Sequence, residues 1–118
     1  MSTENDLYKV EEKLWTGNAD DYRRHVDDTC LTVFTEMAGV LDREKIAQSA
    51  GGGRKWSGLK ITRKGYLEPA DGFAMLSYEA TAGRADGTPY KALVSSGYAR
   101  HGKEWKLAFH QQTPLSAD

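Results

Sequence analysis

Apolar residues recur at helical spacing near the start of the chain. They lie three or four residues apart, with two aromatic residues beside them, so they share one side of an α-helix. The members of this apolar stripe are Leu7, Tyr8, Val10, Leu14 and Trp15. We assign Glu11, Glu12 and Lys13 to the outer, solvated side. The pattern predicts an amphipathic helix from Asp6 that is closed by Gly17, since glycine commonly ends a helix.

Two shorter helices are indicated by capping residues. Asn18 can accept hydrogen bonds from the first turn of a helix over residues 19–26, and Asp42 can cap a helix that runs to about residue 50. Between these helices, residues 29–34 are β-prone and predict a short strand, and residues 35–41 predict a loop.

Three consecutive glycines, residues 51–53, follow the third predicted helix. Phosphate-binding glycines precede the N-terminus of a helix. The order is reversed here, so we interpret these glycines as a flexible connector.

Period-two alternation replaces helical spacing in the second half of the chain, which predicts four strands over residues 54–68, 73–82, 90–100 and 105–114. The connections are short, and strands joined by short connections pair antiparallel. Small residues recur on one face of these strands, at Ala74, Ala80, Ala92, Ser96 and Ala108. They predict open space between the sheet and the helices.

The last strand has apolar bulk on one face and small or polar groups on the other. Simple alternation places Trp105, Leu107 and Phe109 together. It places the second group on the opposite face: Lys106, Ala108, His110 and Gln112. Pro114 ends the strand, because proline cannot donate to a sheet ladder.

Three helices followed by an antiparallel meander predict an α+β fold, with the helices packed on one face of a curved sheet. The length of 118 residues fits a single domain. We place that domain at residues 6–114, with flexible tails at 1–5 and 115–118.

Composition narrows the function classes. Sixteen basic residues are offset by 17 acidic ones, for a net charge of −1, which does not favour nucleic acid as a partner. No apolar run has the length of a membrane span and the N-terminus lacks signal-peptide features, so we expect no membrane association and a cytoplasmic protein. The single cysteine, Cys30, is interpreted as a buried small hydrophobe.

Two segments carry a resemblance to a known family. Residues 21–34 include Tyr22, an acidic pair at residues 27 and 28, and the Thr-Val-Phe run that ends at Phe34. Residues 102–114 begin Gly-Lys-Glu-Trp and end His-Gln-Gln-Thr-Pro. Together they resemble the nuclear transport factor 2-like, or cystatin-like (SnoaL-like), superfamily. The branch they resemble most includes the association domain of calcium/calmodulin-dependent protein kinase II and small stand-alone bacterial relatives.

This resemblance covers residues 6 to 114 and implies a cone-shaped domain in which a strongly bent antiparallel sheet wraps three helices. It also implies a homodimer formed through the convex face of the sheet, with Trp105 on that outer face. The pocket arginines of the association domain fall near Ala80, Ser96 and Gln112, and none of these is an arginine. The resemblance therefore implies a pocket that is neutral and polar.

Residues on the small-residue faces, with aromatic and imidazole groups of the first two helices, make the candidate ligand-binding set. Its members are Trp15, Tyr22, His25, Tyr78, Ser96, Tyr98, His110 and Gln112. His110 is interpreted either as a ligand contact, with catalysis as a further possibility, or as a hydrogen-bonded core histidine. We assign no catalytic residue. The histidines lack the spacing of a ligand pair, so we predict neither a metal nor another cofactor.

The sequence favours a dimeric module that either binds a small organic ligand in a neutral, polar internal pocket or serves in association. The alternative is an isomerase, cyclase or dehydratase, which needs an acid or histidine in the cavity. The aspartates at residues 20, 21, 27 and 28 lie on a helix and its exit, and Glu79 faces away from Tyr78. We therefore expect no well-placed acid. A pure assembly domain is the third interpretation.

Overall fold

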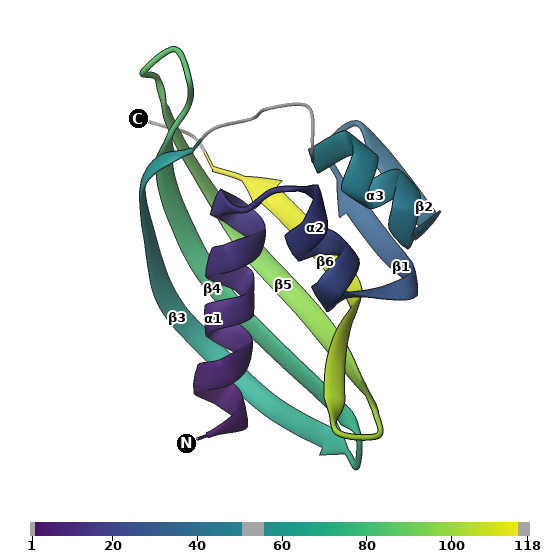
Figure 1. The fold of residues 1–118 in the computed structure, drawn as a ribbon. Coiled ribbons are helices and arrows are strands. Elements are labelled where there is room, and N and C mark those ends of the chain that lie inside the picture. Colours follow the sequence, from purple (N-terminus) through teal and green to yellow (C-terminus); the bar gives the residue numbers. More distant parts are fainter. Residues whose placement is uncertain (1, 51–55, 116–118) are drawn as a thin grey trace.

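The computed structural model describes residues 2–50 and 56–115. In these residues the chain forms three helices and a sheet of six strands. Figure 1 shows the helices packed on a curved sheet. The helices are α1 (Thr3–Thr16), α2 (Ala19–His25) and α3 (Arg43–Ala50). The strands are β1 (Val26–Phe34), β2 (Met37–Asp42), β3 (Ser57–Ala70), β4 (Phe73–Gly83), β5 (Pro89–His101) and β6 (Glu104–Pro114).

The strand order is β2-β1-β6-β5-β4-β3, so the meander from β3 to β6 is antiparallel, as predicted. The exception is β1, which runs parallel to β6 and joins the N-terminal half of the chain to the last strand. Helices α1 and α2 cover one face of the sheet, which we call the inner face (Figure 1). The α+β class inferred from the sequence is confirmed.

Helix α1 begins at Thr3, three residues earlier than predicted, because Ser2 caps it: the Ser2 side chain accepts a hydrogen bond from Asn5 N at 3.1 Å. The buried side of α1 includes Leu7, Leu14 and a residue that we had assigned to solvent. Glu11 is only 1% exposed. That assignment was wrong because residues 7, 11 and 14 continue the same helical stripe.

The capping predictions for the two shorter helices are confirmed. Asn18 and Asp21 form a reciprocal capping box at the start of α2. At α3, Asp42 Oδ1 accepts a hydrogen bond from Lys45 N at 2.8 Å. The predicted connector at residues 51–53 lies outside the described residues.

The predicted loop over residues 35–41 is largely a strand. Residues 35 and 36 make a tight turn, and β2 then pairs antiparallel with β1, from Phe34 opposite Met37 to Thr29 opposite Asp42. Gly39 had indicated a loop, but it pairs with Thr32 within this hairpin. Long-range pairing overrides the local preference of glycine here.

A bulge in β6 corrects the predicted alternation of the last strand. Gly97 of β5 pairs with Phe109, and the next residue, Tyr98, pairs with Leu107, so Ala108 is the extra residue. Leu107 therefore shares the inner face with His110 and Gln112, and Phe109 lies on the outer face. Trp105, expected on the outer face, instead packs against the core.

The outer face of the sheet carries a row of residues, one from each strand, that are paired in register. From edge to edge they are Val40, Leu31, Phe109, Gly97, Met75 and Leu67, which we call the apolar row. A Cβ at Gly97 would lie 3.3 Å from Phe109 Cβ and 3.4 Å from a carbon of the Phe73 ring, so glycine is needed where these two rings meet. Leu67 is 54% exposed and Val40 is 66% exposed.

Candidate functional site

A buried carboxylate organises the inner face. Glu11 projects from α1 toward the sheet, and three hydroxyl groups donate to it. Tyr78 donates to Oε1 at 2.5 Å and Ser96 donates to the same oxygen at 3.0 Å. Tyr98 donates to Oε2. With donors on both oxygens, the carboxylate is satisfied although it is withdrawn from water.

The hydrogen bonds continue from Ser96 toward the ends of β5 and β6. Ser96 Oγ lies 2.8 Å from His110 Nδ1, and His110 Nε2 lies 2.9 Å from Gln112 Oε1. Gln112 Nε2 then donates to the hydroxyl of Tyr90 at 3.0 Å. On the other side, Trp15 Nε1 donates to the Tyr78 hydroxyl at 2.9 Å. We call this set the polar network: Glu11, Trp15, Tyr78, Tyr90, Ser96, Tyr98, His110 and Gln112.

Electrostatics keeps the two phenols of the network in their protonated, donating form. Burial raises the pKa of Tyr78 and of Tyr98 well above the ordinary value of 10.0, and the nearby charge of Glu11 raises it further. His110 Nδ1 lies 3.9 Å from Glu11 Oε1, and the His110 side chain is 14% exposed. The imidazole is therefore the basic group of the network and the link between its buried and outer parts.

Six of the eight candidate site residues come together in the polar network, namely Trp15, Tyr78, Ser96, Tyr98, His110 and Gln112. The other two belong to α2 and lie outside it. Tyr22 donates to the backbone oxygen of Leu14. The Nε2 atom of His25 is buried and has no hydrogen-bond partner in the described part of the chain.

Sequence reasoning missed Glu11 and Tyr90. The expectation that no acid is well placed was wrong, since Glu11 stands at the centre of the network. Its spacing from Leu7 and Leu14 is the signal that could have identified it, because a charged residue on an apolar stripe is rarely buried without partners. Tyr90 lies on the same face of β5 as Ser96 and Tyr98. The alternation of side chains along the strand could therefore have identified it.

Tyr78 and Tyr98 themselves are fully buried and fill the interior beside α1. A cavity of about 560 Å³ lies instead where β3 begins, β4 ends and β5 begins. Ala82, Arg84, Pro89, Tyr90 and Pro114 are among its lining residues. Tyr90 is thus the residue that the polar network and this cavity share.

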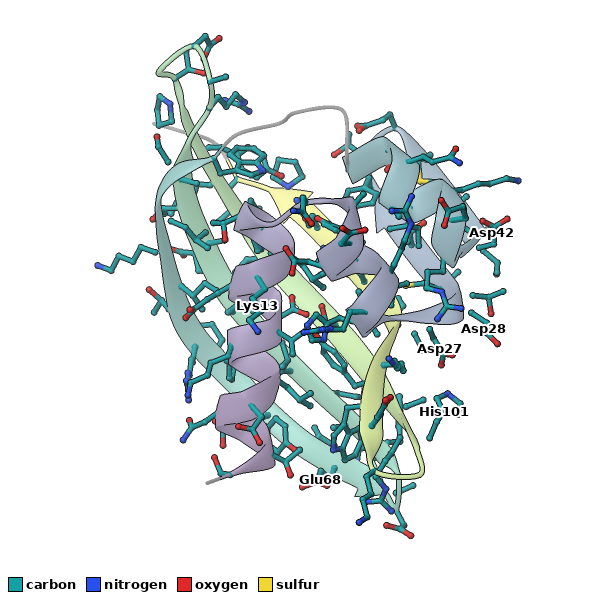
Figure 2. The ribbon with its side chains drawn as sticks, in the orientation of Figure 1. Lys13, Asp27, Asp28, Asp42, Glu68 and His101 are labelled. Carbon is teal, nitrogen blue, oxygen red and sulfur yellow. The ribbon has the colours of Figure 1, made fainter. Side chains whose placement is uncertain are left out.

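Two other reactive or titratable features of the described residues, Cys30 and the His101–Asp27 pair, lie apart from the polar network. Burial raises the pKa of Cys30 to about 12, which leaves its thiol unreactive. His101 Nε2 lies 2.8 Å from Asp27 Oδ2, and Figure 2 places this pair away from Lys13 on α1. Across residues 2–50 and 56–115, no group of three histidine, cysteine or acidic side chains is arranged to hold a metal ion.

Within the same two ranges, no helix is long and apolar enough to cross a membrane. No protein-family model and no curated protein sequence matches the chain.

Solved structures are similar in fold. An NTF2-like protein of unknown function from Prochlorococcus superposes with a TM-score of 0.80 at 15% identity, over 100% of this chain and 97% of the other. An NTF2-like protein of unknown function in nutrient uptake from Rhodospirillum rubrum gives 0.80 at 14% identity, over 98% and 100%. A protein from Exiguobacterium sibiricum, named for the calcium/calmodulin-dependent kinase II association domain, gives 0.73 at 17% identity, over 98% and 92%.

These likenesses extend over nearly the whole of each chain and agree with the order of helices and strands described above. The chain therefore has the nuclear transport factor 2-like fold that the sequence resemblance predicted.

Proposed function

We propose that this protein is a homodimeric module that binds a small organic ligand. The observation that carries the ligand-binding part is the continuity of the polar network with the cavity through Tyr90. A pure assembly domain has no need to bury a carboxylate and connect it to a cavity, because buried polar groups cost free energy unless they are fully hydrogen-bonded.

The dimer part of the proposal is supported by the apolar row on the outer face. The row leaves Val40, Leu31 and Leu67 exposed on three strands, with half-buried Met75 and Phe109 between them. A contiguous apolar surface of this kind indicates a face that a second copy covers. In a two-fold dimer, which is the commonest arrangement of homo-oligomers, the same patch of each copy packs against the other. The partner proposed here is therefore another copy of this chain, docked through the convex sheet face.

Two measurements test the module. Thermal unfolding across a panel of metabolites is expected to reveal at least one compound that raises Tm, because a ligand that binds only the folded state stabilises it. Mass in solution is expected to be twice that of the chain. A panel without any stabilising compound defeats ligand binding, and a monomeric mass defeats the dimer.

An enzyme is the second candidate, and Glu11 is the observation that favours it. An acid hydrogen-bonded to two tyrosines, with a histidine close by, is the set of groups that isomerases, cyclases and dehydratases use at a carbon next to a carbonyl. Glu11 is 1% exposed, however, so a substrate would meet His110 rather than the carboxylate. Turnover that survives in both His110→Ala and His25→Ala would eliminate this candidate.

A further inference from the structure

The chemistry of the cavity indicates which class of small molecule fits it. Its volume of about 560 Å³ lies within the range of about 300–1,000 Å³ that is typical of ligand sites. Ala82, Pro89 and Pro114 offer apolar surface, Arg84 offers a positive charge and Tyr90 offers a hydroxyl. No aspartate or glutamate occurs among the lining residues that the structure describes.

Arg84 keeps donors available for a ligand. Its Nη1 donates to the backbone oxygen of Pro89 at 2.8 Å and to Thr88 Oγ1 at 3.4 Å, and its guanidinium carbon lies 4.9 Å from the centre of the Tyr90 ring. Nε and Nη2 have no hydrogen-bond partner among the described residues. The nearby acid, Asp86, accepts from both the N and the Oγ1 of Thr88. A planar anion such as a carboxylate suits a guanidinium held this way.

Lys91 also lines the cavity, but its ammonium group has a partner elsewhere. Its Nζ lies 3.7 Å from Glu79 Oε2. Arg84 is therefore the cation that a ligand would meet.

The hydrogen bonds of the polar network can all be made with either of two placements of its protons. Ser96 has one hydroxyl proton and donates it to Glu11, so His110 Nδ1 must carry the proton of the bond to Ser96. In the arrangement described here, Gln112 Oε1 faces His110 Nε2. When this oxygen faces Nε2, Nε2 must carry a proton as well, and His110 is then an imidazolium beside the Glu11 carboxylate.

The second arrangement follows from loss of the Nε2 proton to solvent. The Gln112 amide then turns over, its nitrogen donates to the bare Nε2, and its oxygen accepts from the Tyr90 hydroxyl. In the first arrangement, by contrast, Gln112 Nε2 donates to Tyr90. The Tyr90 proton is then free to be donated, and no described residue accepts it.

The protonation of His110 thus decides whether Tyr90 can donate to a ligand. We call His110, Gln112 and Tyr90 the relay. The titratable groups of the polar network, and those that act on it, come from several elements. They are Glu11 of α1, Tyr22 of α2, Cys30 of β1, Tyr78 of β4, and Tyr90 and Tyr98 of β5. Phe34 of β1, with its ring centre 5.9 Å from that of His110, adds an apolar neighbour.

We propose that the cavity binds a small organic carboxylate between the guanidinium of Arg84 and the hydroxyl of Tyr90, and that Gln112 couples this binding to the Nε2 proton of His110. The inference rests on the proposed ligand-binding function and names its ligand class and its site. Because the state that carries the extra proton is the one that donates to the ligand, affinity falls as pH rises.

The test uses the full chain and matched pairs of probes: benzoate, phenylacetate and cinnamate, each against its neutral amide. Calorimetry at pH 6 and pH 8 is expected to show that a carboxylate binds at least tenfold more tightly than its amide, and more tightly at pH 6. Arg84→Gln, an exposed loop substitution, is expected to weaken binding at least tenfold, as is Tyr90→Phe. Lys103→Gln, which changes an exposed cation in the β5–β6 turn, is the matched control and keeps the wild-type affinity.

Two further measurements test the coupling between His110 protonation and ligand binding. Gln112→Leu is expected to bring the ratio of the dissociation constants at pH 8 and pH 6 to one. Nitrogen NMR of the saturated protein is expected to show both ring nitrogens of His110 protonated. A ratio that stays at its wild-type value in Gln112→Leu, or a bare Nε2 in the complex, overturns the coupling.

Failure of this inference and failure of the proposed function look different. If the amides bind as well as the carboxylates, or if Arg84→Gln binds like the wild type, the carboxylate site is overturned while ligand binding stands. If neither these probes nor any compound of the metabolite panel binds, both are overturned.

Discussion

The inner and outer faces of this sheet reverse the usual relation between polarity and exposure. The inner face buries a carboxylate, Glu11, under two phenols and a serine, whereas the outer face leaves Val40 and Leu67 more than half exposed. Helices cover the inner face, so its polar groups must find partners within the chain. No described helix covers the outer face (Figure 1). The contrast teaches that the polar groups of the inner face find their partners within the chain, whereas the outer face leaves apolar side chains in contact with solvent.

Removal of the buried carboxylate is expected to have the largest effect on the stability of the inner face. Glu11→Ala leaves three buried hydroxyls without their acceptor and opens a cavity, so it is expected to lower the free energy of unfolding by about 3–5 kcal/mol. Urea denaturation measures the loss. Glu12→Ala is the matched control: its side chain is exposed, and a change within about 0.5 kcal/mol is expected. Equal losses in the two variants would mean that the network does not stabilise the fold.

A single donor to Glu11 is worth less than the carboxylate itself. Tyr98→Phe keeps the ring and removes one hydrogen bond to Glu11, so a loss of about 1–3 kcal/mol is expected from leaving a buried acceptor less satisfied. The same urea titration measures it. Tyr98→Phe as stable as the wild type would show that Ser96 and Tyr78 suffice.

A charge placed in the apolar row of the outer face is expected to weaken the proposed dimer. Burial of a leucine side chain is worth about 1.5–3 kcal/mol, so Leu67→Lys is expected to raise the dimer dissociation constant at least tenfold and to leave monomer folding intact. Sedimentation equilibrium measures the constant. The neighbouring Glu68 projects to the other face of β3, and Glu68→Lys should dimerise like the wild type.

The smallest effect is expected from the pH response of α2. The pKa of His25 is lowered from its ordinary value of 6.5, first by burial and then by the charges of Lys13 and Lys106. The unfolded chain therefore binds more protons once the pH falls below 6.5, and stability declines until the pH passes below the lowered folded-state value. His25→Gln should remove this decline, measured as Tm between pH 7 and pH 5. An unchanged profile would assign the decline to other groups.

Much of the fold could be predicted from the sequence because its signals are local. Asn18 and Asp42 cap helices where their side chains indicated, and alternation located the four strands of the meander. Strand β2 and the parallel β1–β6 pair could not be predicted in this way, because their evidence lies in long-range pairing. The bulge at Ala108 leaves no signal in the sequence pattern, and it breaks the alternation, so that Leu107 lies on the same face as His110.

The site was harder to predict than the fold. The alternation of side chains along the strands, with small residues on one face, was enough to group Tyr78, Ser96 and Tyr98. All three lie on buried strand faces. The acid that unites them was assigned to solvent because glutamate is seldom buried, although its helical spacing from Leu7 and Leu14 indicated otherwise. The spacing of a residue was a better guide to its burial than its charge.

The parallel pairing of β1 with β6 has a consequence for biosynthesis. Residues 26–34 leave the ribosome early, yet the strand beside which they settle is completed only at residue 114. Contacts so distant along the chain form slowly. The β1–β2 hairpin must therefore wait with one edge unpaired until translation of β6 is finished, and during that interval the nascent chain is most open to aggregation or to chaperone binding.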